Sequence, residues 1–194
     1  SCLSIDRLTD FAWRNGYQAV GLIDQNVMYG VMEFQKACEK RSLKPLYGLE
    51  INVTINERRY PYVLLARNLE GFRELMKVSS QINAEHVEFD RERLESLSDN
   101  LFIIDVCYGG YLEKNIRNAR ETVKWYKQHN IFIGLKPAKG IYDYQLNSEI
   151  SNIAFESGLT PIAMPLGLYE NEDDFQAYRV FQQLNNEESI SESN

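Results

Sequence analysis

The stretch from Ala19 to Gly30, AVGLIDQNVMYG, is the part of the sequence that most constrains the fold. A short apolar strand ends in an acid and then leads towards a helix. In α/β barrel enzymes the catalytic and ligand-bearing groups stand at the C-terminal ends of strands and in the loops that follow. Asp24 has such a position, but the next residue, Gln25, carries a neutral amide, which is a poor ligand for a hydrolytic metal. The stretch therefore predicts a barrel-type site with an incomplete ligand set.

The rest of the chain alternates between strand and helix patterns. Ser4 is a candidate cap for a first helix that ends at Asn15-Gly16, and Asn68 and Asp90 are candidate caps for two later helices. A polar turn at Asn56-Glu57 predicts a hairpin. Strands are expected at 19–23, 46–53, 51–54 with 59–66, 101–105, 131–135 and 161–164, and further helices at 28–41, 112–128, 144–156 and 172–184. This alternation predicts βαβ units and a largely parallel sheet.

Length and composition favour one domain. The 194 residues include 44% hydrophobic residues, enough for one well-buried core. We expect this domain to span residues 1–184 and the polar, acidic residues 185–194 to form a linker towards further domains. The sequence begins with Ser1 and runs directly into a helix signal, so we expect it to be a piece of a longer gene product.

Charge and cysteine content argue against several classes of function. The chain has 28 acidic and 21 basic residues, a net charge of -7 and a pI near 5.0. Such a surface disfavours direct binding of nucleic acid, whose phosphates are neutralised by Lys and Arg. Three dispersed cysteines suggest neither a disulfide framework nor a zinc ribbon. Since no apolar run approaches the roughly 20 residues that span a bilayer, we expect no membrane partner and a cytoplasmic location.

Three candidate metal ligands stand near strand ends: Asp24, Glu50 and Cys107. In a barrel these ends converge on one face, where the three side chains would meet. Each also has a simpler interpretation, as a helix cap, a solvated strand residue and a small buried hydrophobe. The two histidines, His86 and His129, lie away from strand ends. No catalytic set can be assembled, so the sequence predicts no catalytic and no cofactor-binding residue.

Five segments in order resemble a known family. Residues 22–30 are similar to its LTDHGNMFG motif, 33–38 to EFxKAC, 44–50 to KPIIGxE, 63–72 to VLLAKNxxGY and 107–110 to CLGG. This family is the N-terminal PHP (polymerase and histidinol phosphatase) domain of the bacterial replicative DNA polymerase III alpha subunit. The resemblance implies a distorted parallel (β/α)7 barrel, whose first strand, with an HxH pair, would precede this sequence.

The resemblance also implies which family ligands are present. Asp24, Glu50 and Cys107 match family ligand positions, whereas Gln25 and Pro61 replace histidines, a later strand-end histidine falls near Ala138, and residues 165–168 replace a terminal NDxH motif. A multinuclear metal cage needs most of its ligands and their supporting shell. We therefore expect no bound metal and no other cofactor in this segment.

The resulting interpretation is a degenerate PHP domain that supports DNA replication as a structural or partner-docking module. The resemblance implies that the parent chain is a DNA-directed DNA polymerase, a nucleotidyltransferase whose later domains hold Mg²⁺. Its expected partners are those remaining polymerase domains, a proofreading exonuclease and other replisome subunits. Two alternatives are an active metal-dependent PHP phosphoesterase or proofreading exonuclease, and an α/β domain that only binds proteins.

Overall fold

The computed structural model describes residues 3–106, 109–138 and 140–164. These residues fall into two compact units, one made of 3–20 and 32–45 and the other of 21–31 and the described part of 46–164. The predicted helix 172–184, the predicted linker 185–194 and Cys107 lie outside the described residues. Among the described helices, none is long and apolar enough to cross a bilayer.

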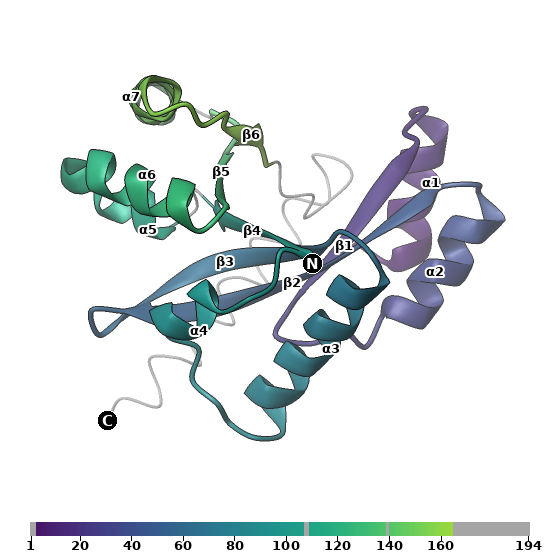
Figure 1. The fold of residues 1–194 in the computed structure, drawn as a ribbon. Helices are drawn as coiled ribbons and strands as arrows, with labels where there is room; N and C mark the ends of the chain where they lie inside the picture. The colour runs from purple at the N-terminus through teal and green to yellow at the C-terminus, as the bar shows by residue number, and fades with distance from the viewer. Residues whose placement is uncertain (1–2, 107–108, 139, 165–194) are drawn as a thin grey trace, which may run out of the picture. The chain divides into compact units, whose positions relative to one another are not determined.

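Helices and strands alternate along most of the chain (Figure 1). The helices are α1 (Ile5–Arg14), α2 (Val31–Lys40), α3 (Leu69–Asn83), α4 (Arg91–Glu95), α5 (Tyr111–Lys114), the 3₁₀ turn η1 (Ile116–Asn118), α6 (Ala119–Gln128) and α7 (Ile141–Glu156). The strands are β1 (Ala19–Gln25), β2 (Lys44–Ile55), β3 (Arg58–Ala66), β4 (Leu101–Val106), β5 (Ile131–Leu135) and β6 (Ile162–Ala163).

Three predicted helix caps are confirmed. The side chains of Ser4, Asn68 and Asp90 each accept a hydrogen bond from the backbone N–H three residues later, at 3.3, 3.0 and 2.9 Å. The predicted single helix 112–128 is instead three pieces, α5, η1 and α6. The break follows Asn115, whose side-chain amide donates to the Tyr111 carbonyl at 2.8 Å. Asn side chains compete in this way with continued helix formation.

The strands form one six-stranded sheet in the order β1-β2-β3-β4-β5-β6. β4, β5 and β6 pair in parallel, as predicted, whereas β3 is antiparallel to both β2 and β4. The antiparallel pairing of β2 with β3 follows from the two-residue turn Asn56-Glu57, whose φ angles of +51° and +63° are those of a tight hairpin. The predicted hairpin therefore lies within the sheet, and the sheet is mixed.

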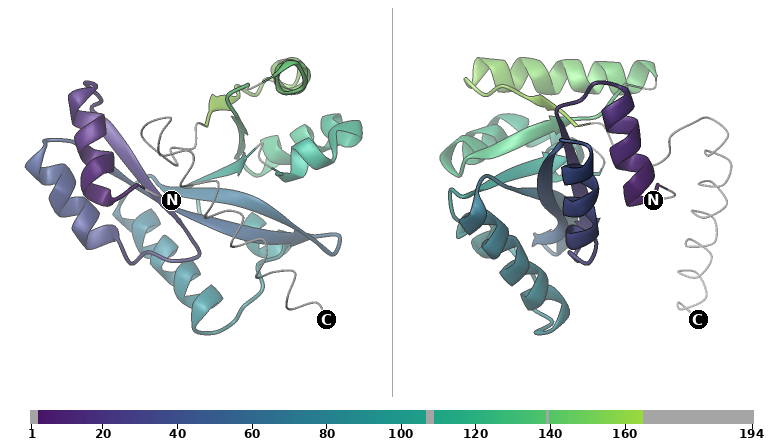
Figure 2. Two further views of the ribbon diagram at one scale, coloured as in Figure 1. Left: turned by 180° about the vertical axis from the view of Figure 1, so that it is seen from behind. Right: turned by 90° about the vertical axis from the view of Figure 1, so that its right-hand side faces the viewer.

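The two faces of the sheet differ in what covers them. One, the helix-covered face, carries Leu49, Tyr62, Ile103 and Ile131, which pack with residues of α3, α6 and α7 in the main hydrophobic core. The opposite, inner face carries a smaller apolar cluster of Val63, Ile104, Val106 and Met164, with Ile23, Leu65, Phe132 and Ile162 packed against it. Figure 2 shows the described helices of the larger unit from two further sides.

The smaller unit has its own contacts. Ala12 of α1 and Phe34 and Cys38 of α2 are buried. The guanidinium of Arg41 lies 2.8 Å from an Asp6 carboxylate oxygen and ties the end of α2 to the start of α1. None of the candidate site residues belongs to this unit.

Candidate functional site

The pairing of β1 with β2 decides which side chains meet at the end of β1. The Asn26 N–H donates to the Glu50 carbonyl and the Lys44 N–H to the Gln18 carbonyl, both at 2.9 Å. Between the first and the second of these bonds in space, the residue numbers rise on both strands, from 18 to 26 and from 44 to 50, so the strands are parallel. In a parallel ladder an N–H bonds to the residue before its partner. The partners are therefore offset by 25 positions, and Gln25 pairs with Glu50.

The glycines of these strands agree with this register. A Cβ built on Gly21 would be 4.0 Å from the Leu46 Cβ, and one built on Gly48 would be 2.9 Å from the Ile23 Cγ1. Both pairs have the same offset of 25. Side chains on paired residues point to the same face and alternate along each strand. Gln25 and Glu50 therefore share the inner face with Ile23.

Asp24 consequently lies on the helix-covered face, on the opposite side of the sheet from Glu50. The sequence predicted that these two carboxylates would converge, and the structure does not bring them together. Burial raises the pKa of the Asp24 carboxyl. Burial also raises the pKa of the Glu50 carboxyl. Each of the two carboxyl groups is therefore desolvated on its own face of the sheet, apart from the other.

A continuous row of side chains crosses the inner face at the level of Glu50. Register pairs Glu50 with Val63, Val63 with Ile104, and Ile104 with Phe132. Together with Gln25, the row reads amide, carboxylate, valine, isoleucine and phenylalanine. One step further along the hairpin, Asn52 pairs with Pro61. Glu50 is thus the single ionisable side chain in a row that is otherwise neutral.

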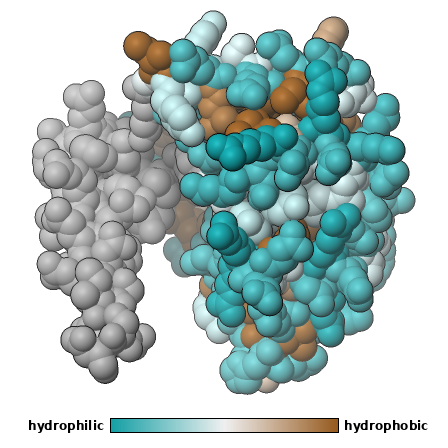
Figure 3. Space-filling model, turned by 90° about the vertical axis from the view of Figure 1, so that its left-hand side faces the viewer, coloured by the Kyte–Doolittle hydropathy of each residue, from teal (hydrophilic) through white to brown (hydrophobic). Residues whose placement is uncertain are grey.

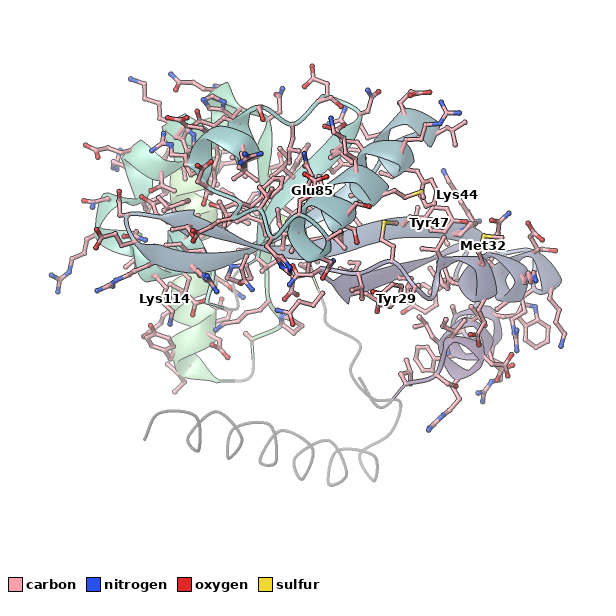
Figure 4. The ribbon with its side chains drawn as sticks, turned by 90° about the horizontal axis from the view of Figure 1, so that it is seen from below. Tyr29, Met32, Lys44, Tyr47, Glu85 and Lys114 are labelled. Carbon is pink, nitrogen blue, oxygen red and sulfur yellow. The ribbon has the colours of Figure 1, made fainter. Side chains whose placement is uncertain are left out.

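The loop after β1 is fixed by α3. The Asn26 carbonyl accepts hydrogen bonds from the Ser79 hydroxyl at 2.9 Å and the Asn83 amide at 2.5 Å. Asn26 itself has a left-handed φ of +60°. On the same side of the sheet, Tyr47 of β2 packs on Phe72 of α3, with ring centroids 5.1 Å apart; Figure 4 labels Tyr47 beside this helix. The loop geometry is therefore set by packing and hydrogen bonds.

The remaining sequence candidates do not complete a metal site in the described part of the chain. His86 is exposed in the loop after α3, and His129 ends α6 with its Nε2 3.9 Å from a Glu95 carboxylate oxygen. Among the described residues, no group of three or more His, Cys, Asp or Glu side chains is placed to hold a metal ion. Glu50 and Gln25 alone do not fit a multinuclear centre.

Sequence reasoning missed a buried carboxylate, Asp105, on the helix-covered face. It is fully buried in β4 and accepts hydrogen bonds from the backbone N–H groups of Tyr111 and Leu112 at 3.0 and 2.8 Å. The Tyr126 hydroxyl donates a third bond at 2.6 Å, and its oxygen is 3.3 Å from the Tyr62 hydroxyl. Burial raises the pKa of the Asp105 carboxyl to about 6, while these hydrogen bonds oppose the rise.

The role of Asp105 is to anchor the chain segment that follows β4. Gly110 allows this contact, because a Cβ there would collide with the Asp105 carboxylate and the Val106 carbonyl. An acid at the end of an apolar strand, followed within five residues by Gly109-Gly110, is the signal that could have indicated it. Its position on the helix-covered face separates it from Glu50.

At the end of β5, Lys136 occupies the position after the last strand residue. Its ammonium lies 3.4 Å from a Glu113 carboxylate oxygen and 2.9 Å from an Asp143 oxygen, and its side chain is 15% exposed. The two carboxylates raise the pKa of the Lys136 ammonium against the opposing effect of burial. Lys136 thus connects the end of β5 to α5 and α7 through its ion pairs with Glu113 and Asp143.

Comparison with known families and proteins agrees with this architecture. A family description for the PHP domain matches residues 1–136. The chain belongs to the PHP domain family. It is 26% identical over 206 residues to the DNA polymerase III subunit alpha of Bacillus subtilis (strain 168), and 28% identical over 205 residues to that of Staphylococcus aureus (strain COL). These alignments cover 100% and 99% of this chain but only 18% of either relative.

Two solved structures show the PHP-type α/β fold. An amidohydrolase from Chromobacterium violaceum, solved with bound sulfate and without metal, superposes with a TM-score of 0.52 at 12% identity and covers 85% of this chain and 84% of its own. A protein from Bifidobacterium adolescentis, assigned provisionally as a metal-dependent phosphoesterase, gives a TM-score of 0.53 at 12% identity, with 80% and 79% covered. The predicted α/β barrel class is confirmed.

Proposed function

We propose that this chain is the PHP domain of a bacterial replicative DNA polymerase III alpha subunit and that it acts without metal, as a structural and partner-docking module in cytoplasmic DNA replication. The alignment with two alpha subunits along the whole chain supports the first part. Because the chain spans 18% of those relatives, polymerase activity, Mg²⁺ and replisome partners such as a proofreading exonuclease belong to the proposal for the longer protein.

The observation that carries the metal-free assignment is the inner-face row around Glu50. Catalytic zinc sites use at least three protein ligands, usually imidazoles, thiolates and carboxylates. Here the neighbour of Glu50 on β1 is the Gln25 amide, and its neighbour on β3 is Val63.

The test measures metal content and hydrolysis together. The purified chain is incubated with Zn²⁺ or Mn²⁺, desalted and analysed by elemental mass spectrometry, and bis-p-nitrophenyl phosphate and a primer with a mismatched 3′ end serve as substrates. We expect metal far below one ion per chain and the same background turnover for the unmodified chain and for Glu50→Gln. Glu57→Gln, an exposed hairpin variant, is the matched control.

The alternative is an active metal-dependent phosphoesterase or proofreading exonuclease, for which the provisional assignment of the Bifidobacterium neighbour is the motivation. It requires one or more tightly held metal ions per chain. Turnover that a chelator abolishes, and that Glu50→Gln removes while Glu57→Gln does not, would establish this alternative and refute the proposal.

A structural role also predicts how variants of the longer polymerase should behave. There, Glu50→Gln should leave primer extension unchanged, whereas a substitution that disrupts packing of the domain, such as Gly48→Ala, should lower the thermal midpoint and the yield of active polymerase. Equal loss of primer extension in both variants would argue that Glu50 itself has a functional role.

A further inference from the structure

We draw no further inference here: the strongest candidate, the outward side of α7 with its exposed residues Ile141, Tyr144 and Phe155, which lies at the top of the molecule in Figures 1 and 3, carries nothing because nothing in the described part of the structure shows what covers it.

Discussion

The buried Asp105 carboxyl makes the stability of this domain depend on pH in a direction that can be worked out. Its pKa is about 6 in the folded chain, compared with 3.8 for an ordinary aspartate. The folded state therefore binds the proton more tightly than the unfolded state. The stabilisation is fully present below pH 3.8 and is lost as the pH rises through about 6. When the pH falls from 7.5 to 4.5, the contribution of Asp105 to the free energy of unfolding should increase by about 2 kcal/mol.

The hydrogen bonds show how the proton is accommodated. A proton on the Asp105 Oδ2 can be donated to the Tyr126 hydroxyl oxygen, which is 2.6 Å away. Tyr126 can then donate to the Tyr62 hydroxyl at 3.3 Å, so the chain of bonds reverses without moving a heavy atom. The two backbone N–H groups keep their carboxyl oxygen acceptors. Protonation therefore removes the buried charge, and the bond that the Tyr62 hydroxyl donates to Tyr126 in the ionised state is exchanged for one that it accepts.

The perturbation is Asp105→Asn, which does not titrate, and the assay is urea unfolding at pH 4.5 and 7.5 followed by tryptophan fluorescence. The difference in stability between the unmodified chain and the variant should be about 2 kcal/mol larger at pH 4.5. Other acids with raised pKa values, including Asp24 and Glu50, cancel in this difference. Asp99→Asn is the control at an exposed position. A difference that is independent of pH, or larger at pH 7.5, would refute the reasoning.

Three further predictions can be tested by the same unfolding assay. Asn26→Ala should destabilise the chain by about 1 kcal/mol and Asn26→Gly by far less, since φ is +60° there; equal effects would contradict this. Gly48→Ala should cost about 1–3 kcal/mol, because its Cβ would lie 2.5 Å from a Leu65 methyl, whereas Gly21→Ala has room and should be nearly neutral. Lys136→Met should cost about 1–2 kcal/mol by leaving two carboxylates without their cation, and an unchanged midpoint would refute that role.

Local patterns in the sequence were sufficient for much of the fold. Side-chain caps at Asn68 and Asp90 and the turn at Asn56-Glu57 are short-range features whose chemistry is visible in the sequence. The division of the predicted helix 112–128 was missed, because its apolar spacing continues through Asn115. The antiparallel direction of β4 relative to β3 depends on a long-range pairing, which local spacing does not contain.

The candidate site was predicted less well for the same reason. Sequence reasoning identified Asp24 and Glu50 as strand-end acids, but their faces depend on how β1 aligns with β2. Shifting that alignment by one residue would exchange Asp24 and Gln25 between the two faces. Asp105 was missed because a strand-end acid gives no indication of whether it is buried with partners or exposed to solvent.

The pairing of Gln25 with Glu50 has a consequence for how this lineage can change. Glutamine and histidine codons share their first two bases and differ only in the third. A single nucleotide substitution at the Gln25 codon would therefore place an imidazole next to Glu50, because residue 25 already lies on the inner face of the sheet. The proline codons CCU and CCC also lie one base from histidine codons, whereas every valine codon lies two or more bases away, so an imidazole is as accessible at Pro61 as at Gln25 and less accessible at Val63.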